Sequence, residues 1–282
     1  MEAAKKTILE RIAEDTRLRV DLCKEKASFD AVLKKAQEIA GNEEKPYAFP
    51  FKEALRKEGL SFICEVKKAS PSKGIIAEEF DYLAIAKDYE KAGAAAISVL
   101  TEPKYFLGSD QYLTEIAKEV SIPILRKDFI VDEYQIYEAK VIGASAILLI
   151  CEITGEAELK KYLETAHSIG LSALVEAHTP EQIEKALRAG AEIIGVNNRD
   201  LTNFNVDIDT AKRLRELVPE EVLFVSESGI KTPADVEVQY HAGADGVLVG
   251  EALMRCEDKK EGLERLKSLL PERLPVPQKG MP

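Results

Sequence analysis

Charged side chains capable of proton transfer follow short apolar runs at several places in this 282-residue chain. Glu65 and Lys67 end the run SFICEVK, and Lys127 ends ILRK. Glu176 ends LVE, and Glu227 ends VSE. Ammonium and carboxylate groups that share one cluster keep one another ionised and spread their pKa values, which suits general acid–base catalysis. A lysine in such a cluster can instead form a Schiff base, so these residue types leave both chemistries open.

Small and hydroxyl residues predict a second kind of site, for an anion. Ser228-Gly229 follows the run LFVSE, and Gly250-Glu251 follows GVLV. Glycine lets backbone N–H groups approach an anion, and a helix beginning after Gly250 would direct its positive end toward it. Ser70 begins the string SPSKG, which adds hydroxyls, a cation and a flexible glycine. We expect a phosphate site, although each string taken alone also suits a simple turn.

A repeated pattern predicts the architecture that would hold these groups together. Five times a helical segment is followed by glycine, a small residue and an apolar run. The copies are KAGAAAISVL, VIGASAILLI, SIGLSALVEA, RAGAEIIGVN and HAGADGVLVG. Glycine in the left-handed conformation ends a helix, and a continuously apolar run is typical of a parallel strand covered on both faces.

Filling the gaps between these copies predicts eight strands, each with a helix able to follow it. The expected strands cover residues 61–66, 95–100, 123–126, 145–150, 172–176, 192–196, 222–226 and 246–249. Eight such units favour a (β/α)8 TIM barrel over an open sheet. Barrel enzymes work at the carboxyl ends of their strands, and alternate strands fill each interior layer. We therefore expect a polar layer of Lys67, Lys127, Glu176 and Glu227 around one mouth.

The barrel is expected over residues 61–270, between two smaller segments. Residues 1–60 predict a helical extension packed on the barrel, with an amphipathic stretch over 29–41 and a link, PYAFPF, that leads into the barrel. The charged residues near 5–26 are interpreted as solvated helix faces. Residues 271–282 predict a flexible tail.

Composition excludes several classes of function. The net charge of −11 disfavours binding to nucleic acid or to an anionic membrane through a basic surface. The four cysteines and three histidines are scattered without a metal-ligand spacing, so no metal site is expected. No apolar stretch is long enough to span a bilayer, and the first residues lack the apolar core of a signal peptide. We expect a cytoplasmic protein with reduced thiols.

The strand-end strings resemble a known family when they are taken together and in order. CEVKKASPSKG, LRKDFI, LVEAH, GVNNRDL and SESGI resemble the motifs of the indole-3-glycerol-phosphate synthase family, over about residues 28–270. The resemblance implies a (β/α)8 barrel with an N-terminal helical segment. It also implies a decarboxylating ring closure, without metal or organic cofactor. The implied substrate is 1-(2-carboxyphenylamino)-1-deoxyribulose 5-phosphate, and the products are indole-3-glycerol phosphate, carbon dioxide and water.

The resemblance also implies roles for the charged residues. Lys127 is similar to the general acid that protonates the carbonyl oxygen as the ring carbon attacks. Glu65 and Lys67 match a pair associated with substrate orientation and later proton transfers. Glu176 is similar to a second acid–base carboxylate.

Further matches concern substrate binding. Asn197 and Glu227 resemble groups that hold the ribulose hydroxyls and the charge network, and Arg199 resembles a residue near the substrate carboxylate. The matches for polar and phosphate-binding positions are Ser70, Ser228, Gly229 and Gly250. Glu251 places a carboxylate near the expected phosphate, which is tolerable if only its backbone N–H faces the anion.

Other functions stay open at this point. The chain can be another phosphate-binding barrel, either a phosphoribosyl isomerase or a Schiff-base aldolase, or a non-catalytic scaffold barrel. A scaffold predicts gaps in the strand-end layer, and the sequence has none. The expected partners are a phosphorylated small molecule and, by weak association, other enzymes of the pathway. The apolar groups of PYAFPF are a hypothetical cover for the aromatic ring of the substrate.

Overall fold

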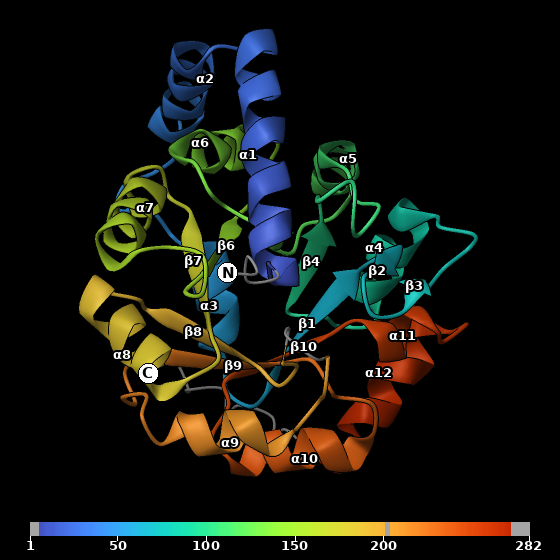
Figure 1. Ribbon diagram of the computed structural model, residues 1–282. Helices are drawn as coiled ribbons and strands as arrows, with labels where there is room; N and C mark the ends of the chain where they lie inside the picture. The colour runs from blue at the N-terminus through green and yellow to red at the C-terminus, as the bar shows by residue number, and fades with distance from the viewer. Residues whose placement is uncertain (1–5, 201–203, 272–282) are drawn as a thin grey trace, which may run out of the picture.

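Eight parallel strands close into a barrel in the computed structural model, which describes residues 6–200 and 204–271 (Figure 1). Around the barrel the strands are β1 (Ser61–Val66), β4 (Ala96–Leu100), β5 (Ile124–Lys127), β6 (Ala146–Ile150), β7 (Ser172–Ala177), β8 (Ile193–Asn197), β9 (Leu223–Glu227) and β10 (Gly246–Val249). Neighbours in the chain are neighbours in the sheet, and pairing of β10 with β1 closes it. The predicted (β/α)8 barrel is confirmed.

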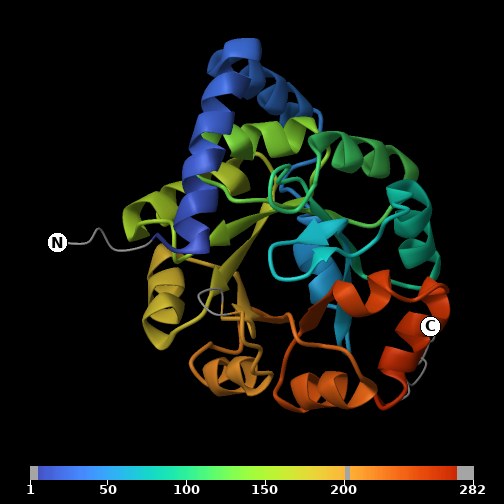
Figure 2. The same ribbon diagram turned by 45° about the vertical axis from the view of Figure 1, so that its right-hand side comes forward.

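Helices follow the strands and form an outer ring (Figure 2). They are α4 (Tyr82–Lys91), α5 (Asp110–Glu119), α6 (Glu133–Val141), α7 (Glu156–Ser168), α8 (Pro180–Ala189), α9 (Asp209–Arg215), α10 (Pro233–His241), the short α11 (Glu251–Met254) and α12 (Lys259–Lys267). Two of them begin at a Thr-Pro pair, where the side chains of Thr179 and Thr232 accept hydrogen bonds from backbone N–H groups of the first turn. No helix in the described ranges is long and apolar enough to cross a membrane.

The glycines of the repeat end these helices as the pattern predicted. All five adopt a positive φ, for example 96° at Gly143 and 90° at Gly190. At Gly143 a Cβ atom would also lie 2.8 Å from Cβ of Ala117, so a side chain fits neither the backbone nor the space. Each glycine therefore turns the chain from an outer helix into the next buried strand.

Alternation along the strands divides the core into two layers. In β1, Ile63 packs inside the barrel, whereas Phe62 and Cys64 pack between the strands and the helices. The inward register that begins with Ile63 continues through Glu65 to Lys67, so the polar side chains emerge at the carboxyl end of the barrel interior. A strand that is otherwise buried and apolar thus places its charged side chains at the carboxyl end of the barrel.

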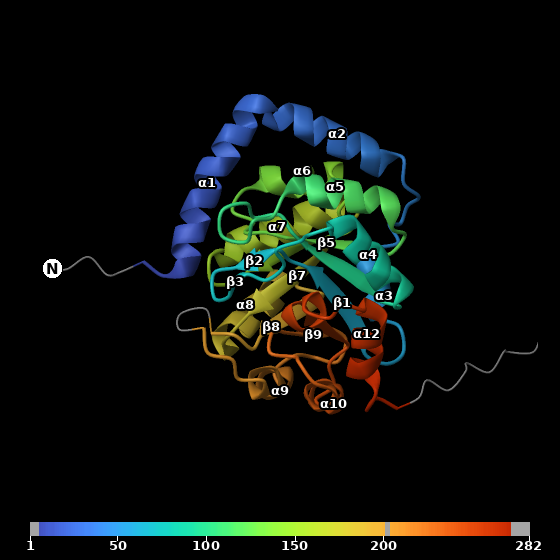
Figure 3. The ribbon, with the colours of Figure 1, turned by 90° about the vertical axis from the view of Figure 1, so that its right-hand side faces the viewer.

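The N-terminal segment forms three helices, α1 (Ile8–Lys26), α2 (Phe29–Gly41) and α3 (Pro50–Leu55). Figure 3 shows α1 and α2 outside the ring, with α2 lying along α6. Helix α1 begins at a capping box between Thr7 and Glu10, and its apolar side contributes Ile12 to the core. Helix α3 sits at the amino ends of the strands, where Ser61 Oγ donates a hydrogen bond to the carbonyl of Ala54. Of the predicted tail, residues 272–282 lie outside the described residues.

The expectation that PYAFPF covers the substrate is wrong. Tyr47 donates a hydrogen bond to the carbonyl of Ser168, and the Phe49 ring stacks edge-on against His167 at the end of α7. Phe51 is fully buried in the barrel interior as part of α3. The segment therefore closes the amino end of the barrel, opposite the end at which Lys127 emerges.

A buried arginine ties β5 to the helices on either side of it. The Arg126 guanidinium is 1% exposed and donates hydrogen bonds to Asp110 at 2.8 Å, Glu138 at 2.7 Å and the carbonyl of Gln135 at 2.9 Å. Burial raises the pKa of Glu138, and the guanidinium opposes this rise. A buried ion pair that loses one partner leaves the other charge without compensation.

We predict that Arg126→Met lowers the free energy of unfolding by about 3–5 kcal/mol, because Glu138 is then left half-buried without its cation. Urea denaturation followed by circular dichroism measures this difference. The matched control is Arg188→Met, whose side chain is 55% exposed and pairs with Glu156 and Glu184. This control is expected to cost less than about 1 kcal/mol. Equal losses in the two variants would contradict the structural role of Arg126.

Candidate active site

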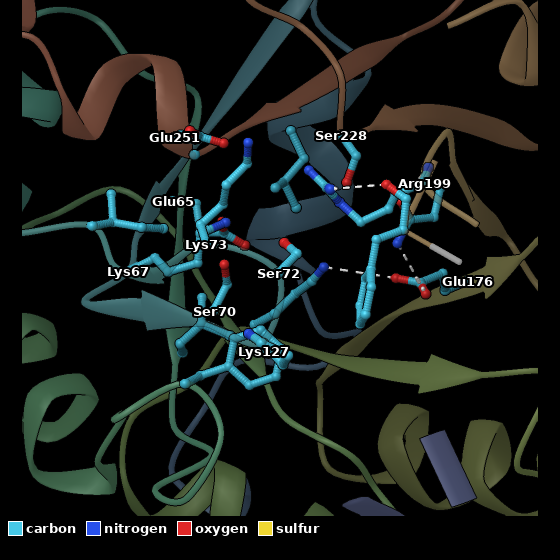
Figure 4. A pocket seen from close by; sticks show the side chains of 18 of the residues that line it. Glu65, Lys67, Ser70, Ser72, Lys73, Lys127, Glu176, Arg199, Ser228 and Glu251 are labelled. Carbon is cyan, nitrogen blue, oxygen red and sulfur yellow. Dashed lines mark hydrogen bonds and ion pairs between the residues drawn. The ribbon is translucent and has the colours of Figure 1, made fainter. Parts of the chain in front are cut away.

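A pocket lies at the carboxyl ends of the barrel strands (Figure 4). Eleven of the twelve residues predicted for the site line it, namely Glu65, Lys67, Ser70, Lys127, Glu176, Asn197, Arg199, Ser228, Gly229, Gly250 and Glu251. The twelfth, Glu227, does not line the pocket. It is 1% exposed and lies against the Lys127 ammonium.

The Lys127 ammonium is shared by two carboxylates. Its Nζ lies 2.8 Å from Glu227 Oε2 and 3.7 Å from Glu176 Oε2, and its side chain is 13% exposed. Burial alone would lower the pKa of Lys127, but the negative charges of Glu227 and Glu176 outweigh burial and raise this pKa well above its ordinary value. The ammonium is therefore charged at neutral pH and presents N–H donors to the pocket.

The pKa of Glu227 is also raised, but here burial is the main cause. Burial raises the pKa of Glu227 to about 7; the Lys127 ammonium opposes this rise and the charge of Glu176 adds to it. Its Oε2 accepts the hydrogen bond from Lys127, whereas its Oε1 is buried without a hydrogen-bond partner in the described part of the chain. Glu227 thus titrates near neutral pH while Lys127 remains charged.

A second ion pair lies across the pocket. Lys67 Nζ donates to Glu65 Oε2, as period-two alternation places the two side chains on one side of β1. Burial would raise the pKa of Glu65, but the charges of Lys67 and Lys127 lower it below its ordinary value. Gly250 makes room for the pair, because a Cβ atom there would lie 2.8 Å from Lys67 Nζ and inside van der Waals contact with Glu65.

Asn197 orients the Glu176 carboxylate. Asn197 Nδ2 donates to Glu176 Oε1 at 3.4 Å, and Asn197 Oδ1 accepts from the backbone N–H of Arg199 at 3.0 Å. His178 Nε2 lies 3.4 Å from the same Glu176 oxygen but makes no hydrogen bond to it. Glu176 Oε1 is therefore held on its protein side, and Oε2 is left to face the ammonium of Lys127.

The loop after β9 makes a sharp turn at the pocket wall. Ser228 and Gly229, which both line the pocket, have positive φ, 64° and 83°. Asn198 Nδ2 holds this strained turn by donating at 3.0 Å to Ser226 Oγ and to the carbonyl of Ser228. The Glu251 carboxylate pairs with Arg255 at 3.1 Å, so its charge is partly offset.

Several residues that line the pocket were not among the site residues predicted from the sequence. Phe129 and Phe106 form an apolar wall with ring centroids 6.1 Å apart, whereas Lys73, the cation expected from the string SPSKG, enters from the hairpin of β2 (Ala69–Ser70) and β3 (Gly74–Ile75). Phe129 follows Lys127 by two residues, so alternation could have placed it on the same side. The apolar wall is completed by Ile8, Leu9 and Ile12 of α1, a helix whose charges had predicted solvated faces. The described residues contain no group of three or more His, Cys, Asp or Glu arranged to hold a metal ion.

Solved structures share the fold at low sequence identity. 3-Hexulose-6-phosphate synthase from Salmonella typhimurium superposes with a TM-score of 0.61 at 14% identity, covering 74% of this chain and 97% of that one. A chain of the tryptophan synthase complex from Pyrococcus furiosus superposes with a TM-score of 0.56 at 17% identity, covering 74% and 98%. At such identities the likeness shows the barrel alone.

Sequence comparisons are far more specific. A model of the indole-3-glycerol phosphate synthase family matches residues 9–266. The indole-3-glycerol phosphate synthase of Ruminiclostridium cellulolyticum is 52% identical over 260 residues, covering 92% of this chain and 98% of that protein. The protein of the same name from Endomicrobium trichonymphae is 54% identical over 260 residues, covering 92% and 99%. The chain belongs to the indole-3-glycerol phosphate synthase family.

Proposed function

We propose that this chain closes the ring of 1-(2-carboxyphenylamino)-1-deoxyribulose 5-phosphate, with the Lys127 ammonium as the acid. The family is that of a decarboxylating lyase of tryptophan biosynthesis. The observation that carries the proposal for Lys127 is its placement on the pocket wall, 2.8 Å from Glu227 and 3.7 Å from Glu176. A charged donor that is fixed before the reaction begins costs no reorganisation when charge develops on the substrate.

The first step forms a carbon–carbon bond. The ring carbon that bears the carboxylate attacks the ketone carbon, and the ketone oxygen takes a proton from Lys127 as its bond order falls. Loss of carbon dioxide from the same ring carbon returns an electron pair and restores aromaticity. A positioned acid of this kind contributes typically about 10²–10⁴-fold to the rate.

Later steps expel water. The hydroxyl made from the ketone takes a proton from an acid of the pocket and leaves as water, and the adjacent carbon that is bonded to nitrogen loses a proton to a base of the pocket, which forms the carbon–carbon double bond of the indole. Glu176 and the Glu65–Lys67 pair are the acid–base groups available for these transfers, since all three line the pocket. The balance is one substrate to one indole-3-glycerol phosphate, one carbon dioxide and one water.

The pocket suits the two ends of this substrate. Apolar side chains of Phe106, Phe129 and Ile12 offer a face for the aromatic ring, and Arg199 supplies a cation for its carboxylate. At the other end, backbone N–H groups after Ser228 and Gly250 donate hydrogen bonds to the phosphate. Glu227 does not line the pocket, so we assign it to positioning Lys127 and not to binding hydroxyls.

The alternative of a Schiff-base aldolase is disfavoured by the charge state of Lys127. Imine formation needs a neutral amine, and the charges of Glu227 and Glu176 raise the pKa of Lys127 by more than burial lowers it. Borohydride with substrate tests this alternative, since only an imine would be trapped on the protein. An isomerase assay with a phosphoribosyl substrate tests the remaining barrel alternative.

The cellular setting is a further part of the proposal. Cys23, Cys64, Cys151 and Cys256 are free thiols, which suits a reducing, cytoplasmic location. Weak association with other enzymes of the pathway is proposed on the ground that the product is an intermediate consumed by a further step.

We predict that Lys127→Ala lowers kcat by about 10²–10⁴-fold, because the carbonyl oxygen loses its acid. Indole fluorescence measures the reaction directly, since the chain contains no tryptophan and so adds no indole emission of its own. The control is Lys260→Ala, an exposed lysine on α12 that pairs only loosely, at 3.7 Å, with Glu264. A folded Lys127→Ala variant that keeps the kcat of this control would refute the assigned acid. Wild-type protein that yields no indole would refute the reaction itself.

We predict that kcat/KM falls as the pH drops below about 7, because the pKa of Glu227 is raised to about 7. Above this pH Glu227 is ionised and holds the Lys127 ammonium; below it the carboxyl is protonated and the ammonium loses that partner. Carbon-13 NMR of protein labelled at the glutamate carboxyl carbons follows the titration, and loss of one signal in Glu227→Gln assigns it. A Glu227 carboxyl that titrates near its ordinary value of 4.5 would contradict this account.

A further inference from the structure

Gly195 occupies an inward position of β8 directly beneath the charged cluster. Its neighbours in register are Glu176 on β7 and Val225 on β9. The residues two before and two after it, Ile193 and Asn197, face the barrel interior and the pocket respectively. Gly195 therefore interrupts a column of inward side chains at the layer between the apolar floor and the catalytic groups.

The space left by this glycine is filled by a carboxylate. A Cβ atom on Gly195 would lie 3.1 Å from Leu174 Cδ1, 3.3 Å from Glu227 Cδ and inside van der Waals contact with Glu227 Oε1. That oxygen is buried and has no hydrogen-bond partner among the residues that the structure describes. Glu227 Oε1 is thus held by the shape of its surroundings, while Oε2 meets Lys127 at 2.8 Å.

We propose that Gly195 is a positioning residue, whose missing side chain forms the slot that seats Glu227 against Lys127. The inference rests on the proposed function, in which Lys127 is the acid. It assigns no contact with substrate to Gly195, which does not line the pocket. Its effect passes through Glu227, and from Glu227 to the ammonium.

The backbone around Gly195 cannot yield to a methyl group. The residue pairs with strands on both sides, β7 and β9, so its Cα is fixed by two ladders. The φ angle of Gly195 is not positive, so an alanine is compatible with its backbone conformation. The Glu227 carboxylate, in contrast, is the end of a flexible side chain and can rotate away. The substitution therefore displaces Glu227 and leaves the fold in place.

A second inward glycine supplies a matched control. Gly246 lies at the start of β10, where a Cβ atom would be 3.1 Å from Leu55 Cδ2, 3.4 Å from the carbonyl oxygen of Ser61 and 3.7 Å from Val225 Cγ2. Its surroundings contain no catalytic group. Gly246→Ala therefore crowds the apolar barrel interior without touching the charged cluster, and more mildly than Gly195→Ala, because its closest neighbour would be 3.1 Å away.

The first experiment compares Gly195→Ala with Gly246→Ala in the full chain. We expect Gly195→Ala to lower kcat by about 10²-fold with KM nearly unchanged, as follows from a misplacement of about 1 Å at the reacting groups. The carboxyl carbon of Glu227, followed by NMR, should titrate at a pH different from that of the wild type, because displacement changes both the burial that raises this pKa and the contact with Lys127 that lowers it. Gly246→Ala should leave both kcat and this titration at their wild-type values.

A second variant separates positioning from general crowding. Aspartate at 227 is one methylene shorter, so Glu227→Asp leaves room for a methyl group on residue 195. Adding Gly195→Ala to Glu227→Asp should therefore change kcat by less than about twofold, a strong coupling between the two sites. An equal fold-loss of kcat in both backgrounds would overturn the proposal, and so would an unaltered Glu227 titration in Gly195→Ala. If Gly195→Ala alone fails to fold, a folded double variant supports the slot and an unfolded one overturns it.

The NMR titration of Glu227 tests the role of Gly195 independently of whether the protein forms indole. Should the wild-type protein form no indole, the reaction is refuted, yet the Glu227 carboxyl signal still reports whether Gly195 seats that side chain. Should indole form and the signal not move in Gly195→Ala, the reaction stands and the role of Gly195 is refuted.

Discussion

Burial of a lysine ammonium beside two carboxylates is the constraint on which the rest of the site depends. A buried cation is costly unless partners compensate it, and Lys127 obtains them from two other strands, β7 and β9. The preceding residue, Arg126, is a buried cation on the opposite face of β5, and ion pairs with Asp110 and Glu138 compensate its charge. Alternation thus makes one short strand carry two buried cations, one for the interior and one for the helical ring.

The N-terminal helix, α1, contacts the site in two places along its length. Ile8, Leu9 and Ile12 form part of the pocket wall, and Arg19 pairs at 2.7 Å with Asp128, the residue that follows Lys127. Asp128 is fully buried and also accepts a hydrogen bond from Thr101. Helix α1 is therefore an apolar wall of the pocket near its start and an anchor of the Lys127 segment near its middle. Most of the charged side chains of α1 lie on its exposed face, as the sequence predicted, whereas its apolar residues form a buried stripe on the other side.

Much of this arrangement follows from rules that act over a few residues. Period-two alternation after an apolar run was enough to bring Glu65, Lys67, Lys127 and Glu176 to one mouth, and the glycines of the repeat marked the helix ends. These rules do not predict how deep in the barrel a side chain lies. Glu227 ends its strand as Glu176 does, yet lies behind Lys127, because depth depends on the stagger between neighbouring strands. The destination of PYAFPF and the space above Gly195 depend in the same way on segments distant in the sequence, so no local pattern reports them.

The central claim is that Lys127 delivers a proton to the carbonyl oxygen of the substrate. A crystal structure with an analogue that carries an alcohol in place of the reacting ketone, and so cannot cyclise, tests it most directly. We predict that the alcohol oxygen lies within about 2.7–3.1 Å of Lys127 Nζ, with the phosphate on the backbone N–H groups after Ser228 and Gly250. An alcohol oxygen bound to Lys67, with Lys127 out of contact with the analogue, would contradict it.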